Sequence, residues 1–275
     1  MKKKISFIKM SGAGNDFIVV DNYKKTLKLG KAEIAKLCRR RFSIGADGLM
    51  LLESTEKEHY DFNMRYFNAD GSEAEMCGNG GRCISRFAYL VGRASNTMHF
   101  LAKDGPHYAE VKADGHVKLE MIDPKSIKLN LSVKVRGKTL RGAFANTGVP
   151  HFVTEVKNIS RVDVKTLGNA VRFHKMFAPK GTNVNFVQKK GKDSYLIRTY
   201  ERGVEDETLA CGTGAVAGAV LMHLRKKAGK PVTMHAVGGD LKVYFNDKDG
   251  DITKVMLEGN ARVISAGYIH EEAFI

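Results

Sequence analysis

The chain of 275 residues contains no tryptophan, only four cysteines and no long hydrophobic run. The cysteines (Cys38, Cys77, Cys83 and Cys211) are too few and too scattered for a disulfide scaffold. Because no Cys-x-x-Cys pair and no histidine pair accompany them, we predict neither a zinc site nor a thioredoxin-like dithiol. No apolar run approaches the roughly 18 residues of a membrane span, and residues 5–8 are too short a run for a signal peptide. We therefore expect a cytoplasmic protein that holds no metal and makes no membrane contact.

Basic residues outnumber acidic ones, giving a formal net charge of +15, but they are dispersed along the chain. Short basic runs such as Arg39–Arg41 and Arg225–Lys227 lie beside apolar patterns typical of helix or strand ends. No aromatic-rich motif of the kind that binds single strands is present. The composition therefore predicts no nucleic-acid partner and indicates a mild field that favours anionic small molecules.

An internal repeat relates the two halves of the chain. Arg65-Tyr66-Phe67-Asn68 leads to Cys77-Gly78-Asn79-Gly80, and Arg198-Thr199-Tyr200-Glu201 leads to Cys211-Gly212-Thr213-Gly214. The arginine precedes its cysteine by 12 residues in the first copy and by 13 in the second, and the two cysteines lie 134 positions apart. A repeat of this length predicts two halves of similar structure.

Strand patterns dominate both halves. They predict strands at 5–10, 17–21, 49–53, 61–67, 98–103, 107–112, 116–122, 132–136, 140–146, 183–188, 195–201, 232–236, 241–245 and 253–257, with a loop at 11–16. Helical spacing is confined to 31–40, 164–173 and the segments that begin at the repeated cysteines. In the first cysteine helix we expect one apolar face formed by Cys83, Ile84, Phe87, Leu90 and Val91.

A turn-rich segment near Asp123-Pro124-Lys125-Ser126 indicates the domain boundary. We expect residues 1–126 to form the first half and 127–262 the second, with 263–275 returning to the first half.

Each repeated cysteine is expected at the start of a helix and is followed by Gly-x-Gly. There the helix dipole and spare backbone N–H groups can lower a thiol pKa from about 8.5 into the range of roughly 3.5–7.5. The same amides suit a carboxylate. Two such sites suit a reaction in which a thiolate removes a proton from one face of an α-carbon and a thiol returns one to the other. Cys38 and Cys83 lie on apolar helix faces, and we expect both in the core.

At these motifs the sequence resembles the diaminopimelate epimerases, enzymes of lysine and peptidoglycan-precursor synthesis. The matching segments are Lys9-Met10-x-Gly12-x-Gly14-Asn15-Asp16-Phe17, Phe67-Asn68-Ala69-Asp70-Gly71-Ser72-Glu73, Cys77-Gly78-Asn79-Gly80-Gly81-Arg82-Cys83, Gly181-Thr182-Asn183-Val184-Asn185-Phe186, Tyr200-Glu201-Arg202-Gly203 and Glu207-Thr208-Leu209-Ala210-Cys211-Gly212-Thr213-Gly214. The resemblance implies an α+β fold of two pseudo-symmetric domains, each a curled, mainly antiparallel sheet around a central helix. It implies a homodimer that interconverts LL- and meso-diaminopimelate without pyridoxal phosphate or another cofactor. By the same analogy, Cys77 deprotonates the LL isomer and Cys211 the meso isomer.

The resemblance also implies how the substrate is held. At the reacting centre, the carboxylate suits the amides at Gly78-Asn79 and Gly212-Thr213, and the ammonium group suits Glu201. The distal carboxylate suits Arg202, a bidentate donor, together with Asn68 and Asn183. Asn15 is expected to line the same cleft, and His151 occupies the position of a family histidine near the reacting centre.

Two positions depart from the family pattern. Val149 stands where many members have an asparagine, and Gly48 where some have a glutamine, so part of the distal contact set differs. Three other readings remain open on the residues. A proline or hydroxyproline racemase would have no use for Arg202, and a phenazine-type isomerase does not use this cysteine pair. A basic binding protein would not require a thiol in each half.

Overall fold

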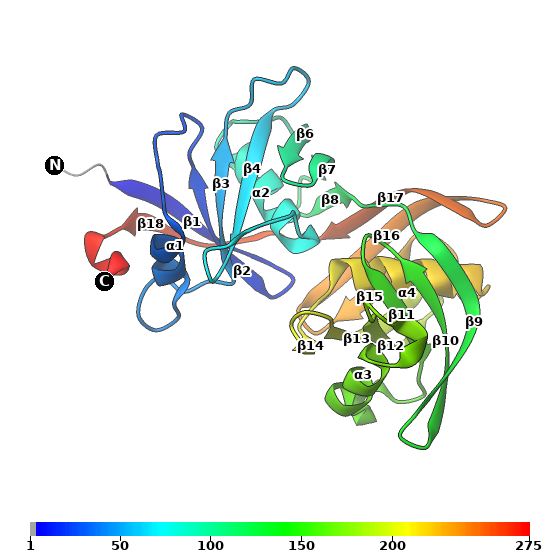
Figure 1. Ribbon diagram of the computed structural model, residues 1–275. Coiled ribbons are helices and arrows are strands. Elements are labelled where there is room, and N and C mark those ends of the chain that lie inside the picture. The colour runs from blue at the N-terminus through cyan, green and yellow to red at the C-terminus, as the bar shows by residue number, and fades with distance from the viewer. Residues whose placement is uncertain (1–3) are drawn as a thin grey trace. The chain divides into compact units, whose positions relative to one another are not determined.

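The computed structural model describes residues 4–275, which divide into two compact units (Figure 1). Unit 1 comprises the described residues up to Leu119 together with Gly259–Ile275, and unit 2 comprises Glu120–Glu258. The first boundary between the two units thus lies a few residues before the turn-rich segment at Asp123–Ser126. Both units are built mainly of strands, with few helices.

Unit 1 winds one sheet around the helix that follows Cys77. Its elements are β1 (Ile5–Gly12), β2 (Asn15–Asp21), α1 (Lys31–Cys38), β3 (Gly48–Glu53), β4 (Phe62–Asn68), β5 (Glu73–Ala74), α2 (Gly78–Leu90), β6 (Thr97–Ala102), β7 (Gly105–Val111), β8 (Val117–Glu120), β18 (Arg262–Ile269) and the 3-10 turn η3 (Glu271–Phe274). The strands pair in the order β18-β1-β2-β3-β4-β6-β7-β8, and β5 adds to the β6 side of β4. The pairs β2–β3 and β4–β6 are parallel, and the others are antiparallel.

Unit 2 repeats this arrangement around the helix that follows Cys211. Its elements are β9 (Lys125–Val135), β10 (Lys138–Asn146), β11 (Pro150–Glu155), η1 (Ile159–Arg161), α3 (Val164–Arg172), η2 (Lys175–Phe177), β12 (Asn183–Gly191), β13 (Ser194–Glu201), β14 (Asp206–Thr208), α4 (Gly212–Leu224), β15 (Val232–Ala236), β16 (Gly239–Lys248) and β17 (Asp251–Gly259). The strands pair in the order β9-β10-β11-β12-β13-β15-β16, with β14 added to β13. Here β11–β12 and β13–β15 are the parallel pairs.

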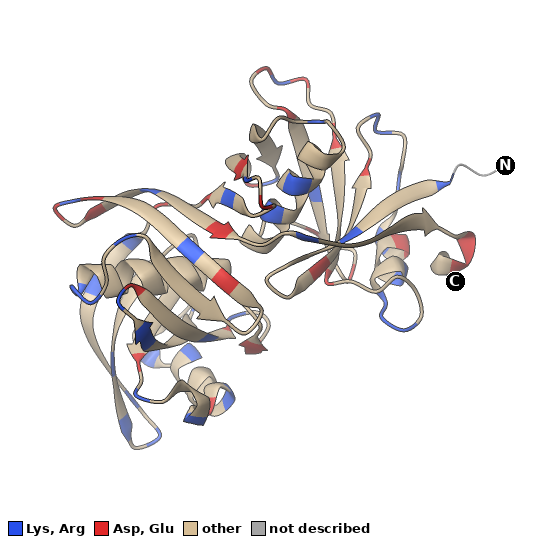
Figure 2. Cartoon of the chain, turned by 180° about the vertical axis from the view of Figure 1, so that it is seen from behind, with Lys and Arg blue, Asp and Glu red and all other residues tan. Residues whose placement is uncertain are grey.

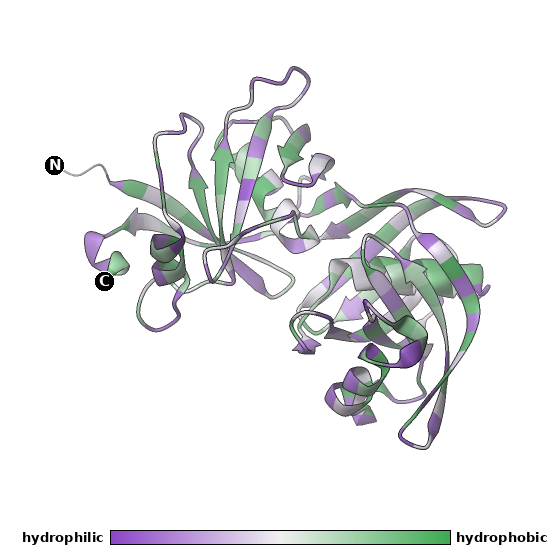
Figure 3. Ribbon diagram, in the orientation of Figure 1, coloured by the Kyte–Doolittle hydropathy of each residue, from purple (hydrophilic) through white to green (hydrophobic). Residues whose placement is uncertain are grey.

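The two units therefore share one topology, which confirms the expected α+β fold of two similar halves. The last strand, β18, takes the place in unit 1 that β9 has in unit 2: β18 pairs with β1, and β9 pairs with β10. The central helices α2 and α4 have 13 residues each, and each contacts several strands around its circumference. In Figure 3 the strands alternate between hydrophobic and hydrophilic residues, whereas α4 is hydrophobic along most of its length.

Small residues let α4 lie close against its sheet. Residues 214–222 of this helix are all buried. A Cβ on Gly218 would lie 2.7 Å from Met234 Cε, closer than van der Waals contact allows. Gly218 and the alanines of α4 thus allow the close approach of this helix to the sheet that their small size predicts.

Several details differ from the expectations. Leu90 was predicted on the apolar face of α2 but is 49% exposed at the last residue of this helix. The predicted loop at 11–16 is only a two-residue turn, since β1 and β2 pair as far as Gly12 and Asn15. Strands β11 and β18 and the short strands β5 and β14 were not predicted, and β9 begins before the predicted residues 132–136. The charges are indeed dispersed over both units (Figure 2), and within residues 4–275 no helix is long and apolar enough to span a membrane.

Candidate active site

The repeated arginines clamp the hairpins that lead to the two cysteines. Arg65 on β4 donates to Glu73 on β5 through Nε and Nη2, at 2.9 and 3.2 Å. Arg198 on β13 donates to Glu207 on β14 in the same forked geometry, at 2.6 Å for both contacts. Each glutamate precedes its cysteine by four residues, so the clamp fixes the chain just before the central helix.

The extra residue of the second copy lies inside the hairpin. The arginine and glutamate are separated by eight positions in unit 1 and by nine in unit 2. Asn68 and Glu201, which were predicted to bind substrate, are the last residues of β4 and β13. They thus occupy equivalent places at the two hairpins, while the side chains differ.

In unit 1, Cys77 is the N-cap residue of α2. Its Sγ accepts a hydrogen bond from the backbone N–H of Gly80 at 3.2 Å, and the side chain is half-buried. A Cβ on Gly80 would lie 3.2 Å from the same sulfur, so the glycine permits this approach. The thiol therefore lies at the positive end of the helix, as the sequence predicts.

A hydrogen-bonded row holds the amide side chains beside Cys77. Asn79 donates through Nδ2 to Asn15 Oδ1 at 2.6 Å, and Asn15 Nδ2 donates to Asp47 at 3.0 Å. On its other side, Asn79 Oδ1 accepts from Arg82 Nη2 at 2.7 Å. The structure thus brings together Asn15, Asn79 and Cys77, and adds Arg82 and Asp47, to which the sequence assigned no role.

Arg82 is a fully buried cation in α2. Besides Asn79 it donates to the carbonyls of Gly78 at 3.1 Å and Asn260 at 3.4 Å. Among the contacts of residues 4–275 it has no carboxylate partner, and burial lowers the pKa of its guanidinium. The sequence feature that could have identified Arg82 is its place within the matched Cys-Gly-Asn-Gly-Gly-Arg-Cys segment, but the burial of its side chain could not be predicted from the sequence.

The space beside Gly48 is filled by Tyr66. A Cβ at position 48 would lie 2.6 Å from Tyr66 Cε2 and 2.4 Å from the carbonyl oxygen of Phe67. A glutamine therefore does not fit here unless both Tyr66 and the backbone at Phe67 move. Burial raises the pKa of the Tyr66 hydroxyl, and the nearby Cys77 adds to the increase, so this phenol is neutral and lies near the thiol.

In unit 2, Cys211 is the N-cap residue of α4 and is 9% exposed. Burial raises the pKa of this thiol to about 12, and the Glu201 carboxylate adds to the increase; the Thr213 side chain and the amides of Gly214 and Thr213 oppose it. The expected lowering of the thiol pKa is thus wrong for Cys211 because desolvation exceeds the helix-end effect. Cys211 is a neutral thiol in this structure.

His151 and Thr213 lie next to Cys211. Thr213 Oγ1 is 3.4 Å from Cys211 Sγ and 2.9 Å from His151 Nε2. His151 is fully buried on β11, and its Nδ1 accepts from Asn185 Nδ2 at 3.1 Å. Glu201 is half-buried at the end of β13, where burial raises its pKa. The structure therefore groups Cys211 with Gly212, Thr213, His151 and Glu201, and adds Asn185.

The side chain of Asn183 is bound to backbone. Its Nδ2 donates to the carbonyl of Pro150 at 2.9 Å, and its Oδ1 accepts from the N–H of Arg202 at 2.8 Å, while only 2% of the residue is exposed. Arg202 is half-buried and its Nη1 donates to the carbonyl of Lys180 at 3.3 Å. Asn183 thus fixes the chain at Arg202 and at the start of β11. Val149 lies half-buried in the turn before β11.

Asn68, the remaining predicted substrate-binding residue, belongs to unit 1. It is exposed at the β4–β5 hairpin and donates through Nδ2 to Ser72 Oγ at 3.2 Å. Its backbone N–H also donates to the carbonyl of Ser72, as turn chemistry predicts for asparagine.

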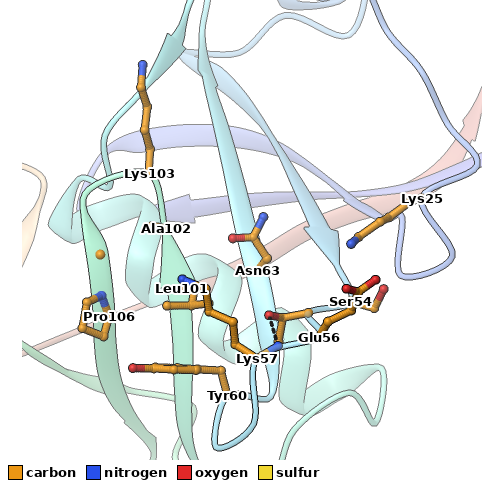
Figure 4. Close-up of a pocket in the computed structure, with 12 residues that line it drawn as sticks. Lys25, Ser54, Glu56, Lys57, Tyr60, Asn63, Leu101, Ala102, Lys103 and Pro106 are labelled. Atoms are coloured by element: carbon orange, nitrogen blue, oxygen red, sulfur yellow. Dashed lines mark hydrogen bonds between the residues drawn. The ribbon is translucent and has the colours of Figure 1, made fainter.

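One open cavity lies elsewhere on unit 1. It measures about 590 Å³ and contains none of the predicted site residues. Lys25, Lys57 and Lys103 line it, but Figure 4 shows Lys103 pointing away from the other two. The ammonium groups do not converge on one point, so the cavity lacks the geometry of an anion site.

Acid should destabilise unit 2 through His151. Burial lowers the pKa of this imidazole from 6.5 to about 3, and Arg202 adds to the shift. Between these values the unfolded chain binds a proton that the folded chain does not, so stability present above pH 6.5 is lost as the pH falls. We expect the free energy of unfolding to fall by up to about 1.4 kcal/mol per pH unit. The difference between wild type and His151→Gln in urea titrations from pH 7 to pH 4 measures this; a constant difference would contradict the assignment.

The fold and the site together define a class of protein. Two units of one topology each wind a mainly antiparallel sheet around a buried central helix and present a cysteine as the N-cap residue of that helix, which defines a two-unit α+β class. Solved structures with this fold include a phenazine biosynthesis protein of the PhzF family from Bacillus anthracis. It has a TM-score of 0.75 and 16% identity, with 98% of this chain and 99% of that chain covered. A hydroxyproline epimerase from Agrobacterium vitis has a TM-score of 0.67 and 13% identity, with 98% and 94% covered.

Sequence comparison is more specific. The family described as "Diaminopimelate epimerase" matches residues 7–127 and 143–264. Curated relatives named "Diaminopimelate epimerase" include one from Aquifex aeolicus, 42% identical with 98% of this chain and 99% of the relative covered. Another, from Chlorobaculum tepidum, is 43% identical with 94% and 99% covered. The chain belongs to the diaminopimelate epimerase family.

Proposed function

We propose that this chain is an epimerase that interconverts LL- and meso-2,6-diaminopimelate with Cys77 and Cys211 as its two acid–base groups. The observation that carries the proposal is the matched pair of cysteines, each at the start of the central helix in a unit of the same topology. The activity would serve lysine and peptidoglycan-precursor synthesis. By family resemblance we also propose that the protein is a cytoplasmic homodimer. Within each chain, residues 1–126 together with 263–275 would form one epimerase half, and residues 127–262 the other.

In the LL-to-meso direction Cys77 acts as the thiolate base and Cys211 as the thiol acid. The raised pKa of Cys211 supports this assignment, because a buried thiol keeps its proton until an acceptor forms. Cys77 takes the α-proton, and the electron pair left on the carbon is delocalised into the α-carboxylate. Cys211 then donates its proton to the opposite face, so the configuration inverts. In the other direction the roles exchange.

The developing negative charge requires donors that are already in place. We assign this task to the backbone N–H groups at Gly78-Asn79 and Gly212-Thr213, which begin α2 and α4. A single well-placed donor of this kind is worth roughly 2.7–4 kcal/mol in a transition state. Several such donors would supply a large part of the barrier reduction.

The rest of the substrate calls for charged partners. Glu201 would pair with the ammonium group at the reacting centre, whose positive charge would hold this half-buried carboxylate ionised. Arg202 would bind the distal carboxylate, assisted by Asn68 and Asn183, and Asn15 would line the cleft. Because Asn183 already fixes the backbone at Arg202, its contribution would be largely to orient that residue.

Proline and hydroxyproline racemase activity is the second candidate. Structures of that kind share the fold at 13% identity, which supports the fold and not the substrate. A ring amino acid has no distal carboxylate, so Arg202 would lack a purpose. Diaminopimelate is therefore the substrate that accounts for more of the charged residues.

Solvent isotope exchange tests the assignment. With diaminopimelate in D₂O we expect deuterium to enter the α-position at a rate comparable to epimerisation, measured by NMR and mass spectrometry. The reason is that a base which removes one proton and an acid which returns another from solvent leave a solvent-derived proton in the product.

Proline serves as the matched comparison, because it has the reacting carboxylate without the distal one. We expect no exchange with proline. Exchange with proline and none with diaminopimelate would overturn the proposed substrate while leaving the cysteine chemistry standing.

A further inference from the structure

Asn185 is a buried amide with all of its contacts inside unit 2. It is 0% exposed on β12. Its Nδ2 is 3.2 Å from the carbonyl oxygen of Phe152, and its Oδ1 accepts from the hydroxyl of Thr199 at 2.9 Å. Because a carbonyl oxygen only accepts, the amide nitrogen must face Phe152, and rotating the amide by 180° would oppose two oxygens. The orientation of the side chain is therefore fixed.

Gly214 makes this position available. A Cβ on Gly214 would lie 2.4 Å from Asn185 Oδ1, far inside van der Waals contact. The second glycine of Cys-Gly-Thr-Gly thus admits Asn185 to the first turn of α4. The glycine three residues after Cys211 therefore has a packing role in unit 2.

The fixed amide determines which nitrogen of His151 carries the proton. Asn185 Nδ2 has hydrogens to donate, and it lies 3.1 Å from His151 Nδ1. His151 Nδ1 must therefore accept, and a neutral imidazole that accepts at Nδ1 is protonated at Nε2. Burial, which lowers the pKa of His151 to about 3, keeps the ring neutral.

The direction of the next two hydrogen bonds follows. His151 Nε2–H points to Thr213 Oγ1 at 2.9 Å, so the hydroxyl oxygen accepts there. A threonine hydroxyl has one hydrogen, and Cys211 Sγ at 3.4 Å is the neighbour to which it can be donated. The row from Asn185 through His151 and Thr213 thus ends with a donor aimed at the sulfur.

We propose that Asn185 is a positioning residue: by donating to His151 Nδ1 it sets the direction of the hydrogen bonds that end on Cys211 Sγ. The inference deepens the proposed function and rests on the assignment of Cys211 as an acid–base group. When Cys211 is a thiolate, the Thr213 hydroxyl stabilises it. When Cys211 is a thiol, its own hydrogen is not bound by Thr213 and remains available to the substrate carbon.

The tautomer of His151 tests the first part directly. We expect the ¹⁵N NMR spectrum of the full-length protein, labelled in histidine and at pH 7, to show His151 with a protonated Nε2 and an unprotonated Nδ1. The His151→Gln variant identifies the signals. In Asn185→Asp, the carboxylate accepts at Nδ1, so we expect the proton to move to that nitrogen. A wild-type ring protonated at Nδ1, or an unchanged tautomer in Asn185→Asp, would overturn the proposal.

Kinetics test the second part. With the opposite tautomer, His151 Nε2 accepts the Thr213 hydroxyl hydrogen, and Cys211 loses its donor. We expect Asn185→Asp to lower kcat with diaminopimelate by about 10²-fold, the lower end of what a positioned proton-transfer group contributes, with little change in KM. A changed tautomer with an unchanged kcat would also refute the positioning role.

Thr199→Val is the matched control. It removes the hydrogen bond to Asn185 Oδ1, in an equally buried place, and leaves the Nδ2 contact with His151. In this variant we expect His151 to keep the wild-type tautomer and kcat to stay within about threefold, since the hydrogen bonds from Asn185 through His151 and Thr213 to Cys211 are intact. If the proposed function itself fails, wild type will show no exchange with diaminopimelate while the tautomer result stands unaffected.

Discussion

Replacing either Cys77 or Cys211 by alanine should lower the rate of epimerisation by at least about 10³-fold, because inversion needs an acid and a base on opposite faces of the carbon. The expected loss is equal in both directions of the reaction, since each cysteine serves once as base and once as acid. The measurement is conversion of LL- to meso-diaminopimelate, and the reverse, by purified variants whose folding is checked by circular dichroism.

Cys83→Ala is the matched control for both variants. Cys83 lies in the same helix as Cys77, is 0% exposed, and has its thiol pKa raised to about 12 by burial. We expect its removal to cost about 1 kcal/mol of stability through lost apolar contact and to leave kcat unchanged. Full activity in Cys77→Ala or Cys211→Ala would end the two-base mechanism, and lost activity in all three would indicate a folding effect.

The starts of α2 and α4 could be predicted from sequence because their signals are local. Each combines a cysteine N-cap with following glycines, and the repeat doubles the evidence at Cys77 and Cys211. The strands beside them follow from alternation and from Asp-Gly turns. Most of the fold and the place of both thiols were available in this way.

Strand β11 was missed because burial on both faces removes the alternation that marks a strand. Residues 151–154 are all buried, and Pro150 at the start resembles a strand breaker. Strand β18 was missed because it is defined by pairing with β1 at the other end of the sequence. Neither feature is contained in a short window of residues.

Electrostatic consequences of burial were also beyond local patterns. The helix-end effect at Cys211 is a property of sequence, whereas the desolvation that outweighs it depends on which side chains close around the sulfur. Likewise Asn185 and Arg82 stood inside matched motifs, but their contacts join elements that are far apart along the chain. The sequence motifs therefore identified both residues, but their roles depend on how distant elements pack and could not be predicted from the sequence.

Arg82→Met should be the most destabilising single change in unit 1. Arg82 is fully buried, and its loss leaves Asn79 Oδ1 and the Asn260 carbonyl without this donor. Each unsatisfied buried acceptor costs about 1–3 kcal/mol, and the shorter side chain leaves a void. We expect a loss of about 3 kcal/mol or more in urea denaturation. Because Asn79 also begins the helix that would bind the carboxylate, we expect KM for diaminopimelate to rise as well.

Arg86→Met separates this effect from a general loss of charge in α2. Arg86 lies one turn further along, is only half-buried, and donates to the carbonyl of Ala261. We expect it to cost about 1 kcal/mol, the value of one hydrogen bond, with KM unchanged. Arg82→Lys should recover part of the stability, since an ammonium group can replace one or two of the three donors. Equal losses for Arg82→Met and Arg86→Met would show that the buried guanidinium has no special part in holding Asn79 beside Cys77.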